Sequence, residues 1–347
     1  MGIKNLRSVL KRHAPNSLGI TKPLSEYIGK TIAVDASVYM YKYKSIYGTQ
    51  WLSAFHNFIK SLDGIKCVFV FDSKECVKEK MVERAKRNSK KKDLRDKVRQ
   101  IEEALVEYTE SGTVADILKT FVHENSNYRR LLVDPGTVSQ DQVLFSETKA
   151  REFLSRSENQ LMSITPTDFS TVKEMCSSMG CATIDAEIEA EFLCAILCHE
   201  NKVYAAMTED SDAYAYMTPR FLCKVGGGKC TEVRAPDVIA ELNMTKHQFV
   251  DLCILCGTDY NDSVRGIGPV KAFKSIKQYG SIKDAAESLT TYNFSKIDID
   301  RVRSLFEIRS SGVDEIVFPE VDSDSLSSIM RRCNIHEKYK KPRRLLN

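Results

Sequence analysis

The stretch Thr31-Ile-Ala-Val34 leads directly into Asp35, and the later stretch Lys66-Cys-Val-Phe-Val-Phe71 leads into Asp72 in the same way. Both stretches are continuously apolar and do not alternate between apolar and polar residues. This pattern is typical of strands that are buried on both faces, as in a parallel sheet covered by helices. Each strand is therefore expected to bring an aspartate to the carboxyl edge of one sheet.

Two more apolar stretches continue this pattern, at Ala182-Thr-Ile184 and Val203-Tyr-Ala-Ala-Met207. Segments with helical periodicity lie between the stretches, for example residues 39–62 and 187–197. Strands that alternate with helices indicate the α/β class. We therefore expect an α/β fold with a mostly parallel central sheet and helices on both faces.

The length of the chain favours one large domain. With 347 residues, of which 42% are hydrophobic, the chain is able to bury a sizeable core. We expect a single domain over residues 1–335. Its expected parts are an N-terminal region (1–98), an inserted arch or cap (99–165), an internal region (166–260) and a C-terminal helical region (261–335), followed by a basic tail (336–347).

Cysteine usage and hydropathy indicate an intracellular protein of the nucleus or the cytoplasm. Eleven cysteines, an odd number, favour reduced thiols over a disulfide framework. No stretch approaches the roughly 18 to 20 uninterrupted apolar residues that a membrane helix needs, so no membrane partner is expected. Cys253 and Cys256 have CxxC spacing, but their apolar flanks favour a buried helix over a zinc or redox site.

Positive charge is concentrated in two segments, although the net charge is only +4. Residues 74–99 contain twelve Lys or Arg and five Asp or Glu, in a segment of helical composition. Residues 331–344 add seven bases and one acid. A single basic run is compatible with a solvated helix face or a nuclear-import signal, whereas two separate runs favour a phosphate backbone as partner.

Acidic residues follow three of the expected strands, as Asp35, Asp72 and the pair Asp210 and Asp212. A single aspartate after a strand is usually a turn residue or a helix N-cap. Ligands in open α/β sheets gather at the carboxyl ends of the strands, so the repetition predicts one acidic crevice. The other acids expected to join it are Glu189, Glu191 and Asp259.

Seven carboxylates in one crevice require cations to offset their repulsion. Oxygen ligands without Cys or His suit magnesium or manganese better than zinc. Two such ions are able to activate a water and stabilise the leaving oxygen of a phosphodiester. The acids and the basic segments together favour a metal-dependent nuclease, with another phosphoryl-transfer enzyme as the alternative.

A glycine loop, Gly266-Ile-Gly-Pro269, follows Asp259 by seven residues. Glycines between helices let a backbone approach a phosphate closely and direct amides towards it. The motif is weak by itself. Its position predicts duplex binding beside the acidic crevice.

Seven segments carry a resemblance to known proteins. They are Met1-Gly-Ile-Lys4, Ala33-Val-Asp-Ala-Ser37, Val70-Phe-Asp72, Glu189-Ala-Glu191, Thr208-Glu-Asp-Ser-Asp212, Phe249-Val-Asp-Leu-Cys-Ile-Leu-Cys-Gly-Thr-Asp-Tyr260 and Arg265-Gly-Ile-Gly-Pro269. In order and local spacing they resemble the XPG/flap-endonuclease family of structure-specific 5′ nucleases, over residues 1–98 and 170–285 and more weakly to about 335. The resemblance implies a PIN-like 5′ nuclease fold with a helical arch and a helix-two-turn-helix element that binds DNA.

The resemblance also implies two Mg²⁺ ions per active site, for which Mn²⁺ may substitute, and a K⁺ ion at the 263–268 loop. The expected ligands are Asp35, Asp72, Glu189 and Glu191 for the first ion, and Asp210, Asp212 and Asp259 for the second. Gly2 is expected to pack close to this site. Tyr41 matches an aromatic residue that stacks on a base beside the scissile phosphate, and the alternative is a core tyrosine.

A helical gateway that steers the scissile phosphate is implied after Asp72. Lys86 matches the arginine of this gateway, and either Lys78 or Lys80 matches its lysine. The remaining residues expected to contact DNA are Arg84, Arg87, Gly266, Gly268, Lys271 and Lys274.

The spacing of the acids departs from the family pattern. Asp35 and Asp72 are 37 residues apart, fewer than in cellular flap enzymes, so the wedge and the 3′-flap pocket of those enzymes are not predicted. Asp72 and Glu189 are 117 residues apart, which predicts an arch enlarged by residues 101–165. No sliding-clamp peptide is visible, and a monomer is expected. This compact form indicates a divergent member, such as one from a large DNA virus.

We therefore expect a flap endonuclease that cleaves 5′ flaps and branched DNA near the junction. We also expect 5′-to-3′ exonuclease activity and a role in DNA replication, repair or recombination. Two alternatives stay open, a four-way-junction resolvase of the same family and a non-catalytic DNA-binding scaffold.

Overall fold

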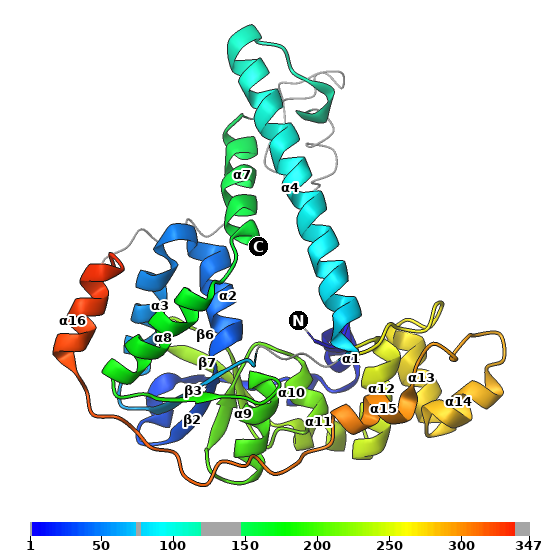
Figure 1. The fold of residues 1–347 in the computed structure, drawn as a ribbon. Helices are drawn as coiled ribbons and strands as arrows, with labels where there is room; N and C mark the ends of the chain where they lie inside the picture. Colours follow the sequence, from blue (N-terminus) through cyan, green and yellow to red (C-terminus); the bar gives the residue numbers. More distant parts are fainter. Residues whose placement is uncertain (1, 74–77, 119–146, 337–347) are drawn as a thin grey trace.

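A computed structural model describes residues 2–73, 78–118 and 147–336, and a seven-stranded mixed sheet lies at the centre of this part of the chain (Figure 1). The sheet order is β1–β7–β6–β5–β2–β3–β4. Only β7 runs antiparallel to its neighbours, β1 and β6. The strands are β1 (Ile20–Pro23), β2 (Thr31–Asp35), β3 (Lys66–Phe71), β4 (Ala182–Asp185), β5 (Ala205–Met207), β6 (Phe221–Gly226) and β7 (Lys229–Val233).

The parallel part of the sheet confirms the expected strands and brings their carboxyl ends to one edge. Asp35 at the end of β2 is in register with Val70 of β3, and Val34 is in register with Met207 of β5. Phe71 of β3 is in register with Asp185 of β4. The residues that follow β2, β3 and β5 therefore start from the same edge.

Three strands, β1, β6 and β7, were not expected from the sequence. β6 and β7 form a hairpin whose turn contains Gly227 and Gly228, both with a positive φ. β6 carries the exposed Lys224, and β1 is largely exposed. Such mixed polarity lacks the continuous apolar run that marks the central strands.

Helices cover both faces of the sheet, and the strands divide their side chains between two hydrophobic clusters. Ala33 of β2 faces one cluster, while Ile32 and Val34 face the other. The helices of the body are α1 (Leu6–His13), α2 (Ala36–Tyr47), α3 (Trp51–Lys60), α8 (Pro166–Ser178), α9 (Ala190–His199), α10 (Asp212–Ala215), α11 (Ala235–Glu241), α12 (Lys246–Cys256), α13 (Pro269–Tyr279), α14 (Ile282–Ser288), α15 (Ile299–Leu305) and α16 (Ser323–Arg332), with short 3-10 turns at Pro15–Ser17, Leu24–Tyr27 and Gly48–Gln50.

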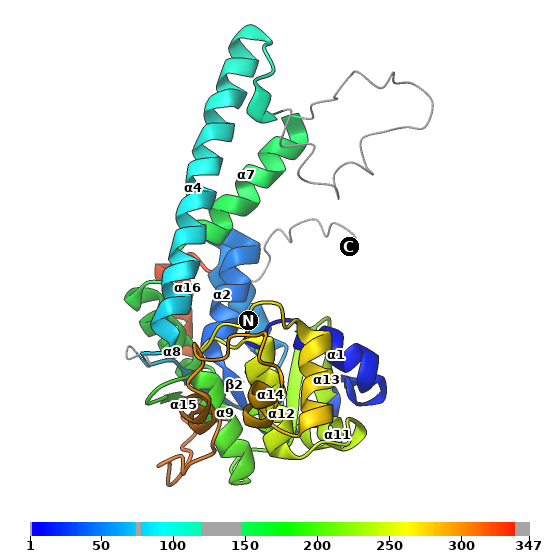
Figure 2. The ribbon, with the colours of Figure 1, turned by 90° about the vertical axis from the view of Figure 1, so that its right-hand side faces the viewer.

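An arch rises from the body, built from α4 (Lys80–Ser111) and α7 (Glu147–Leu161) (Figures 1 and 2). The 32 residues of α4 form one unbroken helix that spans about 48 Å. Ile101 and Leu105 of α4 pack against Leu154 of α7. Residues 80–99 of the basic run and the first residues of the expected insertion are thus one helix, and residues 119–146 of that insertion lie outside the described residues.

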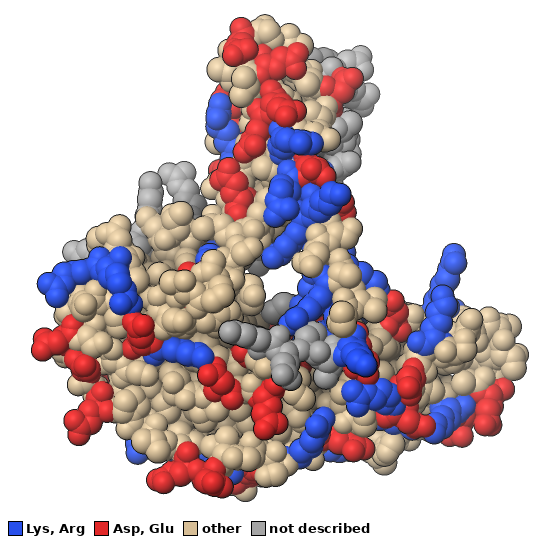
Figure 3. Space-filling view, viewed as in Figure 1, with Lys and Arg blue, Asp and Glu red and all other residues tan. Residues whose placement is uncertain are grey.

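Charge along α4 changes sign. Residues 80–99 contain ten Lys or Arg and three acids, whereas residues 100–111 contain four glutamates and no base. Figure 3 shows the bases on the lower part of the arch and the acids near its tip. None of the helices within the described ranges combines the length and the apolar character that crossing a membrane requires.

A buried ion pair joins α12 and α15. Arg303 of α15 donates two hydrogen bonds to Asp251 of α12, from Nε at 2.7 Å and from an η-nitrogen at 2.6 Å. The backbone N–H of Ile282, at the start of α14, also donates to Asp251. Asp251 is 0% exposed and therefore depends on these donors. The pair holds α12, and with it the loop that follows α12, in place.

We predict that Arg303→Ala lowers the free energy of unfolding by about 3 to 5 kcal/mol, because it leaves a buried carboxylate unpaired. Chemical denaturation measures this change. Arg301→Ala on the same helix is the matched control, because Arg301 is exposed and its pair with Glu79 lies at the surface. The control should change stability much less than Arg303→Ala, because ion pairs at the surface contribute little. Equal losses in the two variants would contradict the role given to the buried pair.

Candidate active site

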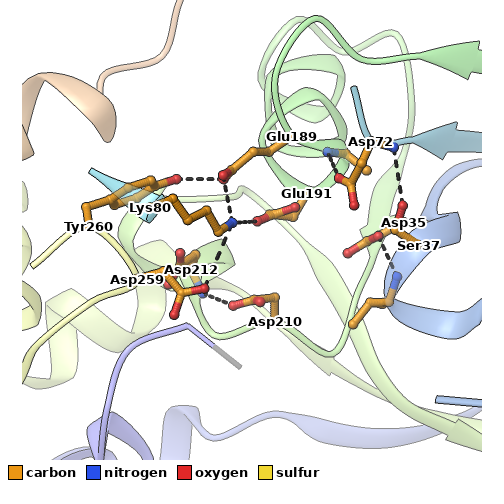
Figure 4. Close-up of polar contacts among 12 residues, drawn as sticks. Asp35, Ser37, Asp72, Lys80, Glu189, Glu191, Asp210, Asp212, Asp259 and Tyr260 are labelled. Atoms are coloured by element: carbon orange, nitrogen blue, oxygen red, sulfur yellow. Dashed lines mark hydrogen bonds and ion pairs between the residues drawn. The ribbon is translucent and has the colours of Figure 1, made fainter. Parts of the chain in front are cut away.

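Seven carboxylates from distant parts of the chain meet at the carboxyl edge of the sheet (Figure 4). Six of them are buried, and Asp72 is the exposed member. They end β2, follow β3 and β5, begin α9, or lie in the loop after α12. Six of the seven line one pocket of about 580 Å³, and Asp212 lies behind it. The structure therefore brings together Asp35, Asp72, Glu189, Glu191, Asp210, Asp212 and Asp259, as the sequence predicted.

Local hydrogen bonds fix the first two aspartates. Asp35 is the N-cap of α2, where it accepts a hydrogen bond from the backbone N–H of Val38 at 3.0 Å. Its other oxygen accepts one from Thr208 Oγ1 at 2.8 Å. Asp72 accepts a hydrogen bond from the backbone N–H of Ala190, the first residue of α9. Asp35 thus caps α2, as an aspartate at this position usually does, and also lines the pocket.

The tight turn after β5 holds Asp210 and Asp212. The backbone N–H of Asp210 donates to Thr208 Oγ1 at 3.1 Å, and the N–H of Asp212 donates to Asp210 Oδ1 at 3.0 Å. Asp212 is 1% exposed, and within the described residues neither of its carboxylate oxygens has a hydrogen-bond partner. A buried acid in this state indicates a missing positive partner.

The N-terminal segment packs directly on this turn. Gly2 has a φ of 81°, and a Cβ atom there would overlap the side chains of Asp210 and Asp212. The backbone N–H of Ile3 donates to Ser211 Oγ at 2.8 Å. The position therefore requires glycine, and the structure places Gly2 beside the acids as expected.

Crowding and burial disfavour the charged forms of these acids. Burial, with the neighbouring Asp72 as the next cause, raises the pKa of Asp35 to about 8. Burial also raises the pKa of Glu191 and of Asp212 well above the ordinary range, and nearby carboxylates add to this. Cations must offset this cost if the acids are to be ionised together.

Lys80 and Arg87 of α4 supply positive charge in the structure. Lys80 Nζ lies 2.6 Å from Glu189 Oε1, 3.6 Å from Glu191 Oε1 and 3.9 Å from Asp259 Oδ2. An η-nitrogen of Arg87 lies 2.6 Å from Asp259 Oδ2. Burial alone would lower the pKa of Lys80, but Glu191 and Glu189 outweigh it and raise that pKa.

Comparison with known proteins assigns the chain to a family. The XPG N-terminal domain matches residues 1–94, and the XPG I-region matches residues 180–259. Flap endonuclease 1 of Phytophthora infestans is 33% identical over 314 residues, which cover 83% of this chain and 69% of that protein. The chain belongs to the XPG/flap-endonuclease family. Flap endonuclease 1-A of Sorghum bicolor is 29% identical and covers 96% of this chain and 83% of its own length.

Solved structures of this family share the fold. The catalytic core of Rad2 in complex with DNA substrate has a TM-score of 0.60 and 20% identity, with 95% of both chains covered. Flap endonuclease-1 from Methanococcus jannaschii has a TM-score of 0.56 and 15% identity, with 91% of this chain and 90% of that chain covered. The expected PIN-like 5′ nuclease fold is therefore confirmed. Members of the family are structure-specific nucleases that depend on divalent metal ions, so the chain is an enzyme of this class.

The chemistry of the pocket suits such ions. Lys80 and Arg87, however, already pair with acids of the pocket, so an ion would compete with them for these oxygens. The acids offer only oxygen ligands, which suits hard divalent cations. The two unpartnered oxygens of Asp212 also fit a nearby cation. Within the described residues, no three acid, histidine or cysteine side chains are grouped closely enough to hold an ion as they stand. Metal binding therefore requires side chains to move. Lys80 must move first, because its Nζ lies near three of the acids.

The gateway bases that line the pocket are not all those that were expected to do so. Lys80, Arg84, Arg87 and Lys91 line the pocket, and their spacing places them on one face of α4. Lys86 lies outside this lining, and its Nζ is 2.6 Å from Asp262 Oδ1 at the surface. Lys78 is exposed before α4 begins. The family resemblance pointed to Lys86 as the match to the gateway arginine, whereas in the structure its neighbour Arg87 faces the acids.

The base of α4 is also attached to the far side of the cleft by exposed ion pairs. Arg301 Nε at α15 lies 2.7 Å from Glu79 Oε1, next to the start of α4. Together with the pair between Lys86 and Asp262, this contact joins the arch to the α12–α15 side.

The other residues expected to contact DNA lie at the surface around the pocket. Tyr41 is 44% exposed on α2 and lines the pocket, so it is not a core tyrosine. In the 263–268 loop, Gly266 has a φ of 88°, and Lys271 donates to its carbonyl oxygen at 3.1 Å. Gly268 is the N-cap of α13, and Lys274 is exposed on that helix. Pocket residues that the sequence did not reveal include Ser37, Asn88 and Lys91.

We predict that Asp212→Asn melts higher than the wild type in the presence of a chelator, by about 2 to 6 °C. The reason is that the substitution removes an unpartnered buried acid worth about 1 to 3 kcal/mol. Added Mg²⁺ should raise the melting temperature of the wild type and raise that of Asp212→Asn less. Thermal unfolding with and without Mg²⁺ measures both effects.

Asp63→Asn is the matched control, because Asp63 is exposed at the opposite end of β3. It should melt like the wild type in both conditions. Stabilisation by Mg²⁺ of equal size in wild type and Asp212→Asn would remove Asp212 from the ligand set.

Proposed function

We propose that this chain is a structure-specific DNA endonuclease that cleaves 5′ flaps and other branched DNA near the junction, with 5′-to-3′ exonuclease activity. One observation supports this most strongly. The pocket that contains the buried acids is faced by a row of bases on α4, from Lys80 to Lys91. Acids suit metal ions, and bases suit the phosphates of the strand that must reach those ions.

The proposed ligands of two Mg²⁺ ions, or of Mn²⁺ in their place, are the seven carboxylates. Asp35, Asp72, Glu189 and Glu191 would hold one ion, and Asp210, Asp212 and Asp259 the other. The ions would supply an activated water and would stabilise the leaving oxygen. The chain itself binds the phosphate, orients it and keeps it near the acids.

The α4 bases have a double role in this proposal. In the structure Lys80 and Arg87 neutralise Glu189 and Asp259. When cations take over that neutralisation, both side chains become available to a phosphate. Arg84 and Lys91 extend the same face along the helix, in the direction that a strand entering the arch would follow.

Tyr41 and the 263–268 loop complete the proposed DNA site. Tyr41 has an exposed ring at the pocket, which is suited to stacking on a base. Lys271 and Lys274 of α13 would contact the duplex backbone. A K⁺ ion at the 263–268 loop also belongs to the proposal, and it would compete with Lys271 for the carbonyl oxygen of Gly266.

The proposed setting is the nucleus, in replication, repair or recombination, with the protein acting as a monomer. A four-way-junction resolvase of the same family would instead need two copies acting together. Sedimentation on junction DNA, with a search for paired symmetric nicks, distinguishes these functions. Monomers that cut a 5′ flap once near the junction are the expected result.

We predict that Asp210→Ala lowers the cleavage rate of an end-labelled 5′ flap by several orders of magnitude, while flap affinity changes little. The reason is that acids act on the chemistry, whereas phosphate contacts elsewhere carry the binding. Single-turnover cleavage in Mg²⁺, repeated in chelator, measures the rate. Asp63→Ala is the control and should cleave like the wild type. Unchanged turnover in Asp210→Ala would contradict the assigned role.

We predict that Arg87→Ala slows single-turnover cleavage at least about tenfold, whereas Lys86→Ala slows it less than about threefold. Neighbouring residues on a helix point roughly 100° apart, so Arg87 faces the acids and Lys86 does not. Affinity for the flap should change little in either variant, because one phosphate contact among many contributes little. If Lys86→Ala cleaves the flap more slowly than Arg87→Ala, the assignment is wrong, and Lys86 must turn towards the acids when DNA binds.

A further inference from the structure

Two buried tyrosines form a hydrogen-bond chain that ends on Glu189. The hydroxyl of Tyr260 donates to Glu189 Oε2 at 2.6 Å. The hydroxyls of Tyr260 and Tyr216 lie 2.9 Å apart. Tyr216 is 1% exposed and Tyr260 is 8% exposed, so water does not substitute for these contacts. Figure 4 shows the Glu189 carboxylate in contact with both the Tyr260 hydroxyl and the Lys80 ammonium, which bind its two different oxygens.

The chemistry of the groups fixes the direction of this chain. An ionised carboxylate only accepts hydrogen bonds, so the hydroxyl of Tyr260 must donate to Glu189. The oxygen of Tyr260 is then the acceptor for the hydroxyl of Tyr216. Because Tyr216 donates to it, Tyr260 becomes a better donor to the acid. Glu189 Oε2 is thereby committed, and Oε1 remains for a cation, at present Lys80.

Aromatic packing holds both rings. The ring of Phe306, directly after α15, lies 5.4 Å from the ring of Tyr216 and 5.4 Å from that of Tyr260. Phe192 of α9 lies 5.0 Å from Tyr216 on another side. The hydroxyls therefore cannot move away without displacing Phe192 of α9 or Phe306 after α15.

Hydrogen bonds also fix the loop that carries Tyr260. The backbone N–H of Tyr260 donates to Thr258 Oγ1, whose hydroxyl donates to Asn261 Oδ1. Asn261 in turn donates to the carbonyl of Ile254 in α12. Asp259, adjacent to Tyr260, belongs to the other group of acids. One fixed loop thus carries an acid of one group and the hydroxyl that orients an acid of the other.

We propose that Tyr260, supported by Tyr216, is a positioning residue that orients the Glu189 carboxylate for a divalent cation. This inference rests on the proposed metal function of the acids. Partners of this kind fix a ligand's orientation, and losing one typically weakens metal affinity by about 10- to 100-fold. Tyr260 does not touch the substrate in this account and acts only through Glu189.

The test uses Tyr260→Phe and Tyr216→Phe, which keep both rings and their packing and remove one hydroxyl each. Mg²⁺ is titrated into the DNA-free protein, and binding is followed by calorimetry and by the rise in melting temperature. We expect the apparent Kd for Mg²⁺ to increase about tenfold in Tyr260→Phe and by a smaller factor in Tyr216→Phe. Tyr214→Phe is the matched control, because Tyr214 packs on Phe221 away from Glu189, and it should bind Mg²⁺ like the wild type.

The outcomes separate this inference from the proposed function. If the wild type binds Mg²⁺ and Tyr260→Phe binds it equally well, the positioning role is wrong and the metal site stands. A lower melting temperature of Tyr260→Phe in chelator, with unchanged Mg²⁺ affinity, would show a purely structural hydroxyl and also overturn the inference. If the wild type does not bind Mg²⁺, the metal site itself is wrong, and the inference fails with it.

Discussion

The dominant constraint on this protein is the cost of holding seven carboxylates together at one edge of the sheet, six in a partly buried pocket and Asp212 behind it. Charges of one sign in a poorly hydrated site repel each other and lose the stabilisation of water. The raised pKa values of Asp35, Glu191 and Asp212 express this cost. The hydrogen bond from Tyr260 to Glu189 and the ion pair of Lys80 with the same acid both reduce this cost. The surrounding fold holds together a group of acids that would otherwise separate.

The acidic group was predictable because it follows from sheet geometry. An apolar run that ends in an aspartate marks both the strand and the edge at which the acid emerges, as at Asp35 and Asp72. The hairpin of β6 and β7 escaped prediction because strands of mixed polarity have no such signal. Likewise, nothing in the order of residues shows that Arg87 faces the acids while Lys86 pairs with Asp262. That choice depends on how α4 is rotated against the body.

Tyr260 illustrates a different limit of sequence reasoning. Its position next to Asp259 is visible in the sequence, but its partner Glu189 is 71 residues away. Buried hydroxyl chains depend on three-dimensional packing, here on Phe306 and Tyr216, which lie on other elements. Family membership and the positions of the acids are therefore accessible from the sequence, whereas the groups that orient those acids require the structure.

The ion pairs at the base of the arch make the attachment of α4 sensitive to the concentration of dissolved ions. The pair between Lys86 and Asp262 is exposed and that between Glu79 and Arg301 is partly exposed, and such pairs are weak and screened by dissolved ions. As ionic strength rises, the foot of α4 should be held less firmly to the α12–α15 side. The attraction of the same helix for phosphates weakens over the same range. Added salt therefore loosens the arch and its hold on a nucleic acid together, without affecting the buried pair of Asp251 and Arg303 to the same degree.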